Sequence, residues 1–237
     1  MKTIIYAVGD IHGRVDLLQQ LQEHIKEHHK FMHAQCDAHI VYVGDYIDGG
    51  AYSVEVIDCL MQGMMGWNST CLLGNHEAMM LECLETDNRE AWHTWLSNGG
   101  DETLASLGVS FRFGGYDPSV LKEALDEERI AWLRSLPLYK IIGPYLFVHA
   151  GIVPEVPIEE QQDKDLLWIR SRFLDSEIDH GHVVVHGHTP GDDPVVKFNR
   201  ICVDTGATSN GQLTTAVLDG VNKPMFLRAT GLAGKRG

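Results

Sequence analysis

The first part of the chain alternates short apolar runs with amphipathic segments. An apolar, β-branched run over residues 3–8 ends in Gly-Asp, and the segment after it carries leucine and isoleucine at helical spacing. The same order of strand, loop and helix recurs from residues 39–50 and again from residues 70–77. Three such units in succession predict a layered α/β fold with parallel strands.

The pattern changes between about residues 88 and 137. The segments "REAWHTWL", "DETLASLG" and "SVLKEALDEERIAWLRSL" have helical character and are rich in tryptophan and leucine, so we expect an inserted helical layer or cap. Short apolar runs then return at "YLFVHAG", "HVVVHGHT", "RICVDTGA", "LTTAVLD" and "MFLRAT". These runs predict a second sheet, mixed or antiparallel, that packs on the first.

Composition narrows the class of protein. The 237 residues are 44% hydrophobic, enough for a sizeable core, and we expect a single domain over residues 1–237. The net charge of −14, from 33 acidic and 19 basic residues, argues against nucleic acid or a membrane surface as a partner. An anionic substrate would need a local source of positive potential.

Cysteine usage and hydropathy indicate the compartment. The five cysteines are scattered without a C-x-x-C pair, which argues against a disulfide framework and against a thiolate zinc site. The N-terminal apolar run stops at Gly9-Asp10, and no stretch approaches the roughly 20 apolar residues that span a bilayer. We therefore expect a cytoplasmic protein.

Polar side chains recur where the predicted strands end. Loops at the carboxyl ends of strands converge on one edge of an α/β sheet. A lone histidine or a Gly-Asp turn has an ordinary structural explanation, but five such loops together predict a single site. Its candidate residues are Asp10, His12, Asp45, Asp48, Asn75, His76, His149, His186 and His188.

This set of ligands contains oxygen and nitrogen but no sulfur. It suits first-row divalent ions such as Mn²⁺, Fe or Zn²⁺ better than Ca²⁺, which prefers oxygen alone. One catalytic ion that keeps an open position for water or substrate needs fewer than six protein ligands. Two ions that share a carboxylate would use all six. We therefore expect two divalent metal ions, with Mn²⁺ as the first candidate.

The motifs "GDIHG", "GDYID", "GNHE", "VHAG" and "HGHT", in this order, resemble those of the metallophosphoesterase superfamily. More narrowly, they resemble the phosphoprotein phosphatases that include bacterial and phage serine/threonine phosphatases. The stretch "WLSNGGDETLASLG" is similar to the helical insert of the bacterial members. The resemblance implies a four-layer α/β sandwich, two mixed β-sheets flanked by helices, with a helical insert at about residues 88–137.

The resemblance also implies a role for each candidate. Asp45 would bridge the two ions, and the other ligands would divide between them, Asp10 and His12 on one ion and Asn75, His149 and His188 on the other. His186 would lie behind the ligands, although the H-x-H spacing leaves a minor ligand role open because alternate residues of a strand face the same side.

The chemistry implied is hydrolysis by direct attack of a hydroxide that bridges the metals, without a covalent intermediate. His76 would protonate the leaving group as general acid, and Asp48 would keep it charged and oriented. Two divalent ions, two carboxylates and one hydroxide leave a formal charge of about +1. That charge would supply the positive potential that the acidic chain otherwise lacks.

The phosphate-binding residues depart from the family pattern. Members normally read Gly-Asp-x-Val/Ile-Asp-Arg-Gly, whereas this chain reads "GDYIDGG", with Gly49 in place of the arginine. The second arginine of bacterial relatives corresponds to Arg170, which would bind phosphate together with Asn75, and Arg172 is a register-shifted alternative. Arg14 could also reach toward a substrate, although a solvent-facing position is the simpler interpretation.

The motifs leave three functions open. The first is a phosphatase acting on a phosphorylated protein or small phosphate ester, with phosphoserine and phosphothreonine as the favoured substrates and phosphotyrosine as another. The second is a phosphodiesterase or symmetrical dinucleoside tetraphosphate hydrolase with Tyr52 stacked on a base, although those hydrolases usually lack the aspartate matching Asp48. The third is a metal-dependent regulator that binds phosphorylated partners without turnover.

Overall fold

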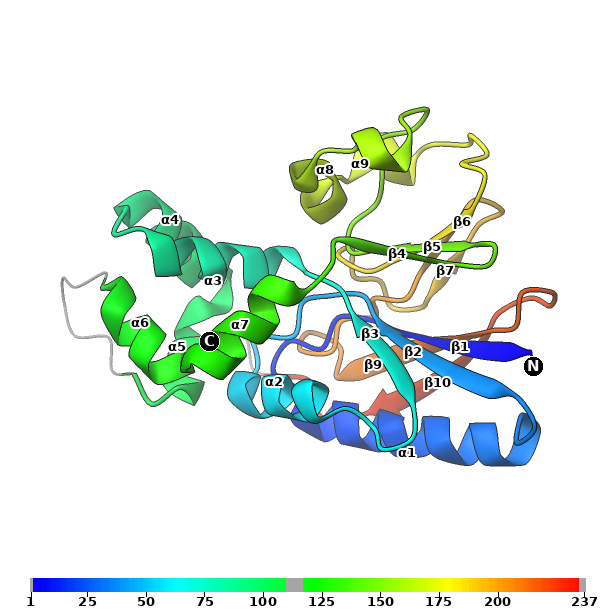
Figure 1. Cartoon of the computed structure of the whole chain (residues 1–237), viewed down its shortest axis with the longest axis horizontal. Helices are drawn as coiled ribbons and strands as arrows, with labels where there is room; N and C mark the ends of the chain where they lie inside the picture. The colour runs from blue at the N-terminus through cyan, green and yellow to red at the C-terminus, as the bar shows by residue number, and fades with distance from the viewer. Residues whose placement is uncertain (1, 110–116, 235–237) are drawn as a thin grey trace.

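Two five-stranded β-sheets packed face to face form the centre of the molecule (Figure 1). The computed structural model describes residues 2–109 and 117–234. The strand order is β10-β9-β1-β2-β3 in the first sheet and β4-β5-β6-β8-β7 in the second. Apolar side chains from both sheets, among them Val41, Phe147 and Val203, form the layer between them.

The first sheet begins with the three predicted β-loop-α units. Its strands β1 (Thr3–Val8), β2 (Asp37–Tyr42) and β3 (Asn68–Cys71) pair in parallel. The helices are α1 (Val15–Met32), α2 (Ser53–Gln62) and α3 (Asn75–Glu85). Side chains alternate along β1, so that Ile4 and Tyr6 pack with the helices whereas Ile5 and Ala7 face the second sheet. The prediction of parallel units is confirmed.

The second sheet is mixed, as predicted. It contains β4 (Tyr139–Ile142), β5 (Tyr145–Val148), β6 (Val183–His186), β7 (Val195–Val196) and β8 (Arg200–Cys202). Strands β5, β6 and β8 are parallel, and β4 and β7 pair antiparallel at the edges.

The prediction was wrong for the last two strands, β9 (Gln212–Leu218) and β10 (Met225–Thr230). They join the first sheet, where β9 pairs antiparallel with β1 and β10 pairs with β9. The apolar pattern of a strand shows that it is buried, but it does not show which open sheet edge the returning chain will occupy.

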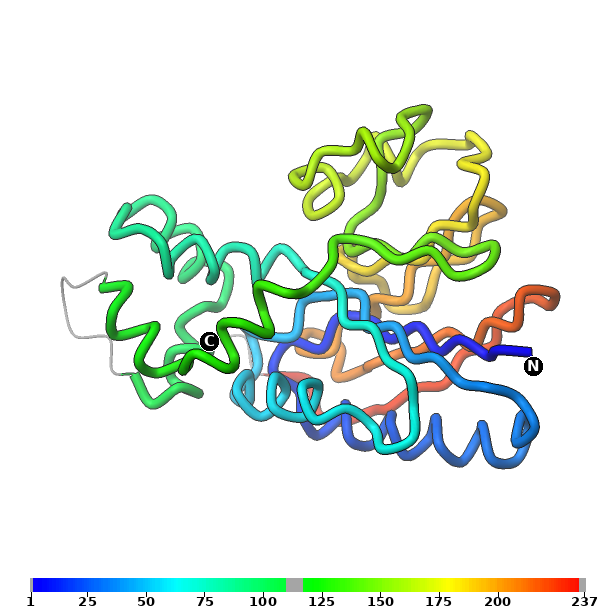
Figure 2. The backbone as a smooth tube through the Cα atoms, in the orientation of Figure 1, coloured from blue at the N-terminus to red at the C-terminus, as the bar shows by residue number. Residues whose placement is uncertain are grey.

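Helices complete the outer layers. Residues 89–109 and 117–135 form a helical lobe at one end of the sandwich (Figure 2). The lobe contains α4 (Arg89–Trp95), the π-helical turn η1 (Leu96–Gly100), α5 (Asp101–Ser106), α6 (Pro118–Leu125) and α7 (Glu127–Ser135). Helices α8 (Asp163–Trp168) and α9 (Ser171–Leu174) pack on the second sheet, which gives the predicted four-layer sandwich.

One expected helix of the lobe is divided in two. Asp126 has a φ of 67° and ends α6. Its side chain then accepts a hydrogen bond from the backbone N–H of Arg129 and so caps α7. The helical periodicity continues across this residue, which is why the sequence predicted a single helix.

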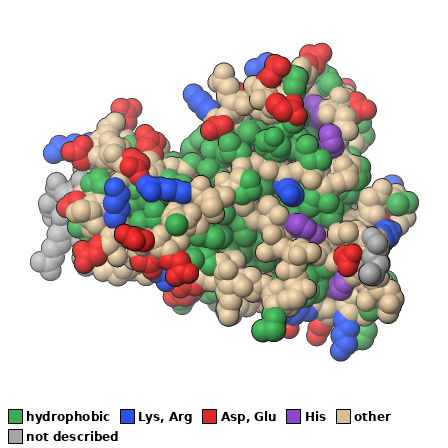
Figure 3. All heavy atoms as spheres, viewed as in Figure 1, with side chains coloured by type: hydrophobic (Ala, Val, Ile, Leu, Met, Phe, Trp, Pro, Cys, Tyr) green, Lys and Arg blue, Asp and Glu red, His purple; other side chains and the backbone are tan. Residues whose placement is uncertain are grey.

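The surface is strongly acidic. On the face shown in Figure 3, Asp and Glu side chains gather over the helical lobe and near α8 and α9, with fewer Lys and Arg among them. This distribution agrees with the net charge of −14. No helix in the described part of the chain is long and apolar enough to cross a membrane.

The two faces of α1 should differ sharply in their contribution to stability. Leu21 is fully buried, whereas Phe31 on the same helix is 78% exposed. We expect Leu21→Ala to lower the free energy of unfolding by about 2–5 kcal/mol, because it leaves a cavity in the core. Phe31→Ala should change it by no more than about 0.5 kcal/mol. Urea unfolding measures both, and equal losses would contradict the assignment of the core.

Candidate metal centre

The loops that follow β1, β2, β3, β6 and β8 meet around one cavity of about 310 Å³. It lies at the carboxyl ends of parallel strands, where the loops of α/β sheets converge. The lining residues include Asp10, His12, Asp45, Asn75, His76, Asn98, Trp168, Arg170, His188, Asp204 and Thr208. His149, which follows β5, is fully buried behind this surface and contacts Asn75.

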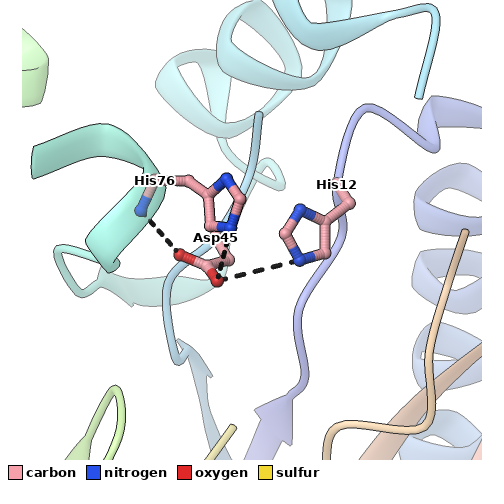
Figure 4. Close-up of side chains that lie close together, drawn as sticks. All are labelled: His12, Asp45 and His76. Atoms are coloured by element: carbon pink, nitrogen blue, oxygen red, sulfur yellow. Dashed lines mark hydrogen bonds and ion pairs between the residues drawn. The ribbon is translucent and has the colours of Figure 1, made fainter. Parts of the chain in front are cut away.

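Asp45 lies between two groups of potential ligands. Figure 4 shows its carboxylate between the rings of His12 and His76. Its Oδ2 is 3.7 Å from His12 Nε2 and 3.8 Å from His76 Nε2, and its Oδ1 is 3.4 Å from His149 Nε2. The ligating atoms of Asp45, His12 and His76 all lie within 4.8 Å of one another, and so do those of Asp45, His149 and His188. One carboxylate shared by two clusters is the geometry expected of a bridging ligand.

Backbone carbonyls hold two of these histidines with one ring nitrogen turned inward. His12 Nδ1 is 2.9 Å from the carbonyl oxygen of Ile47, and His149 Nδ1 is 2.9 Å from that of Val43. Because a carbonyl oxygen can only accept, each Nδ1–H donates, and the Nε2 that faces Asp45 is the nitrogen left to bind a cation. Metal-ligating histidines are commonly held in this way.

The charge states of these rings depend on Asp45. Burial and the neighbouring His76 lower the pKa of His12, which favours the neutral, metal-binding form. Burial acts in the same direction on His149, but Asp45 outweighs it and raises the pKa of that ring. Burial disfavours ionised Asp45 too, yet His149 and His76 hold its pKa well below the usual range. A bound metal ion would displace the proton of His149, as metal binding to histidine generally does.

Acceptor atoms converge where the second ion is expected. Asn75 Oδ1 lies 2.7 Å from His149 Nε2 and 2.8 Å from His188 Nδ1. An amide oxygen and an unprotonated imidazole nitrogen are both acceptors, so these contacts become favourable only when a proton or a metal ion lies between them.

Asp10 provides a further test of whether metal ions fit. Its Oδ2 accepts a hydrogen bond from the backbone N–H of His188 at 2.8 Å, whereas its buried Oδ1 has no partner among the described residues. Burial, Asp204 and Asp45 raise the pKa of Asp10 well above its usual range. A Cβ at Gly187 would lie 1.9 Å from Oδ1, so only glycine allows this carboxylate its position. The donor set therefore fits divalent cations, which would relieve the crowding of negative charge.

His76 and Asp48 form a pair at the edge of the centre. His76 Nδ1 lies 2.7 Å from Asp48 Oδ2, and Asp48 is fully buried. Burial alone would lower the pKa of His76, but Asp45 and Asp48 outweigh burial and raise it to about 9. The contribution of Asp48 persists when Asp45 binds a cation, because Asp48 is not in either ligand cluster. This is the arrangement that the general-acid hypothesis requires.

Glu77 is a residue whose role the sequence analysis missed. Its buried carboxylate accepts hydrogen bonds from the backbone N–H groups of Gly74 at 3.1 Å, Asp45 at 3.0 Å and Tyr46 at 2.7 Å. These bonds fix the loop in which Asp45 has a φ of 54°. The glutamate ends the quoted motif "GNHE", but its identity gave no sign that it would reach back to another loop.

The two candidate phosphate-binding arginines after α8 have different places. Arg170 is exposed and lines the cavity, whereas Arg172 is not among the residues that line it. The position of the missing arginine, Gly49, has a φ of 74° and lies next to the side chain of Thr208, a residue that lines the cavity. The structure thus brings one arginine, not two, to the cavity wall among the described residues.

Arg14 does not have the solvent-facing position that the sequence favoured. It is only 9% exposed, its Nε and Nη2 donate to both carboxylate oxygens of Asp16, and its Nη1 donates to the carbonyl oxygen of Ala207. Because this guanidinium ties the start of α1 to the loop after β8, it is not available to a substrate.

His186 and Tyr52 lie outside the cavity wall. The Nε2 of buried His186 is 3.4 Å from Arg200 Nη1, and its ring packs on Phe173. Strand β6 ends at His186 and His188 has a φ of 64°, so the alternation of a strand does not continue and the two rings do not share a side. A minor ligand role for His186 therefore finds no support. Tyr52 is half exposed and does not line the cavity.

Comparisons with known proteins agree with this geometry. The family model of the calcineurin-like phosphoesterases matches residues 4–211. Serine/threonine-protein phosphatase 2 of Escherichia coli K12 is 30% identical over 222 residues, which cover 89% of this chain and 90% of the relative. A symmetrical bis(5'-nucleosyl)-tetraphosphatase of Aromatoleum aromaticum is 29% identical, over 63% of this chain and 45% of the relative.

Solved structures show the same fold. A protein serine/threonine phosphatase from Saccharomyces cerevisiae superposes with a TM-score of 0.58 at 15% identity, over 99% of this chain and 82% of that one. The chain belongs to the calcineurin-like phosphoesterase family. It is similar to a bacterial serine/threonine phosphatase over nearly its whole length, which places it with the phosphoprotein phosphatases of that family. The protein is therefore a metal-dependent phosphohydrolase.

Metal binding should depend on the shared carboxylate. We expect Mn²⁺ to raise the melting temperature of the metal-free protein, because a ligand that binds only the folded state stabilises it. Asp45→Asn should abolish most of this rise, since both ligand clusters contain Asp45. Asp58→Asn is a matched control, because Asp58 is exposed and pairs with Arg129 in the lobe. Thermal unfolding with and without Mn²⁺ measures this effect. An equal rise in melting temperature in both variants would count against the bridging role of Asp45.

Proposed function

We propose that this phosphohydrolase cleaves phosphomonoesters, with phosphoserine and phosphothreonine in proteins as the main substrates and phosphotyrosine as another. The observation that carries this proposal is the contact between His76 and the fully buried Asp48 beside the ligand clusters. The alkoxide released from phosphoserine is a strong base, and a positioned proton donor lowers the barrier to its departure. Similarity to a bacterial serine/threonine phosphatase over 89% of the chain supports the same substrate class.

Different residues of the site would bind the phosphate and the metal ions. Arg170 at the cavity wall would bind the phosphoryl oxygens by charge-assisted hydrogen bonds, together with the amide of Asn75. Asp10, His12, Asp45, Asn75, His149 and His188 would hold two divalent ions, Mn²⁺ in the first place. Such ions, when bound, supply an acidified water molecule and neutralise phosphate charge.

His76 would deliver the proton from one defined atom. Its Nδ1–H donates to Asp48, so the Nε2–H that faces the cavity is the proton available to the leaving oxygen. Asp48 stabilises the imidazolium and fixes the plane of the ring. After transfer, the neutral ring regains its proton from solvent, because His76 keeps some exposure at the cavity wall, with 14% of its side chain accessible.

Symmetrical dinucleoside tetraphosphates are the second candidate substrate. Gly49 removes one positive charge from the phosphate clamp, and the tetraphosphatase of Aromatoleum aromaticum is nearly as similar in sequence identity, although over a shorter span. Against this substrate, Asp48 is present and paired with His76, and Tyr52, the residue considered for base stacking, lies outside the cavity wall.

A side-by-side assay of three substrates tests the proposal. We expect a phosphoseryl peptide to give a higher kcat/KM than diadenosine tetraphosphate or a bis-aryl phosphate in the presence of Mn²⁺. Asp45→Asn should abolish turnover, which would exclude a regulator that binds without hydrolysis. Faster cleavage of diadenosine tetraphosphate would favour the second candidate, and no turnover of any substrate would favour the regulator.

Restoring an arginine at position 49 should strengthen the phosphate clamp. We expect Gly49→Arg to raise kcat/KM on a small aryl phosphate about ten-fold or more, as a charged hydrogen bond that strengthens in the transition state would. A Cβ there meets the side chain of Thr208 at ordinary contact distances, the nearest atom being its methyl group at 3.4 Å, but the φ of 74° costs an L-residue stability. Gly49→Ala is the matched control, because it carries the same backbone strain without the charge. No gain over Gly49→Ala would contradict the clamp.

A further inference from the structure

The helical lobe reaches the carboxylate of Asp48. Trp95 Nε1–H in α4 donates to both carboxylate oxygens, at 3.2 Å to Oδ1 and 3.1 Å to Oδ2. The hydroxyl of Thr103 in α5 donates to Oδ1 at 2.5 Å. The remaining face of Oδ2 contacts His76 Nδ1 at 2.7 Å. Thus two donors from the lobe and one imidazole surround a single buried carboxylate.

Thr103 also holds the backbone of Asp48. Its Oγ1 accepts from the Asp48 N–H at 3.0 Å and lies 3.0 Å from Ser53 Oγ, which accepts from the same N–H at 3.1 Å. Asp48, Thr103 and Ser53 are all fully buried. Because these groups are shielded from solvent, their hydrogen bonds determine where the Asp48 side chain points.

The donors from the lobe are neutral. Among the described residues, no lysine or arginine forms an ion pair with Asp48, and His76 is its only ionisable partner. Neutral N–H and O–H groups stabilise the negative charge without cancelling it. The negative charge of Asp48 therefore remains available to stabilise the protonated ring of His76.

The backbone of the lobe packs directly against this loop. A Cβ at Gly99 would lie 2.8 Å from the N of Gly49 and 3.4 Å from the Cβ of Asp48, and a Cβ at Gly100 would lie 2.6 Å from the indole ring of Trp95. Gly99 has a φ of 99°, and the non-helical residues of η1 separate α4 from α5. The interruption lets Trp95 and Thr103, from either side of the turn, reach the same carboxylate.

We propose that Trp95 and Thr103 are positioning residues that hold Asp48 against His76, so that the helical lobe completes the proton-donating pair. This inference rests on the proposed role of His76 as general acid. Neither residue lines the cavity, so each acts through Asp48 and not on the substrate. Their loss should matter only when the leaving group needs a proton.

The test compares two aryl esters that differ in leaving group. Phenyl phosphate releases a phenolate of high pKa, near that of tyrosine at about 10, whereas 2,4-dinitrophenyl phosphate releases a stable anion that needs no proton. We expect Trp95→Phe and Thr103→Val each to lower kcat on phenyl phosphate about ten-fold or more. The kcat on the dinitrophenyl ester should fall less than two-fold.

Three further variants separate positioning from folding. Thr103→Ser keeps the hydroxyl and should restore most of the kcat on phenyl phosphate. Trp92 lies in the same helix as Trp95, and its indole N–H donates to the carbonyl oxygen of Thr86. Trp92→Phe removes this donor and should leave the ratio of kcat on the two esters unchanged. Thermal unfolding of each variant checks that the lobe is still folded.

His76→Asn serves as the reference. If it lowers phenyl phosphate hydrolysis selectively while Trp95→Phe and Thr103→Val slow both esters equally, the two lobe residues are only structural and the inference is wrong. If His76→Asn slows both esters equally, the general-acid role fails and the inference fails with it. Selective loss in all three variants supports both.

Discussion

The burial of several carboxylates in one small space is the constraint on which the centre of this protein depends. Asp10, Asp45 and Asp204 are each no more than 4% exposed, and Glu77 is fully buried. Burial and mutual repulsion raise the pKa of Asp10 well above its usual range and that of Asp204 to about 6. Such crowding is unfavourable without positive charge, which histidine protons and divalent cations supply. The strand-end loops that carry these carboxylates therefore form a site for positive charge.

Backbone strain is concentrated in the same loops. Four of the six described residues other than glycine with positive φ are His12, Asp45, Asp48 and His188. Left-handed backbone costs free energy in residues with a Cβ and persists where surrounding contacts over-determine it. Glu77 provides such contacts for Asp45, and Ser53 and Thr103 provide them for Asp48. Contacts from the surrounding loops and helices thus hold these strained residues in place.

The residues around the metal centre identify the family and the reaction class, but they do not identify the substrate. The reason is physical. Ligands for metal ions must converge within a few ångströms, and five loops of this chain meet around one cavity. By contrast, one charged hydrogen bond from a residue of the cavity wall such as Arg170 is worth only about 1.5–3 kcal/mol. The chain is similar both to a serine/threonine phosphatase and to a symmetrical tetraphosphatase.

Local periodicity and the chemistry of single side chains were enough to predict the β-loop-α units and to pick out the strand-end motifs with their candidate metal ligands. They could not show that β9 and β10 join the first sheet, that Arg14 is tied to Asp16 and Ala207, or that His186 turns to Arg200, because these contacts form only in the folded chain. Tertiary structure also decided that Trp95 and Thr103, about 50 residues from Asp48 along the chain, hold its carboxylate. Contacts between distant segments leave no local pattern, since they arise only when loops of different strands are brought to one edge.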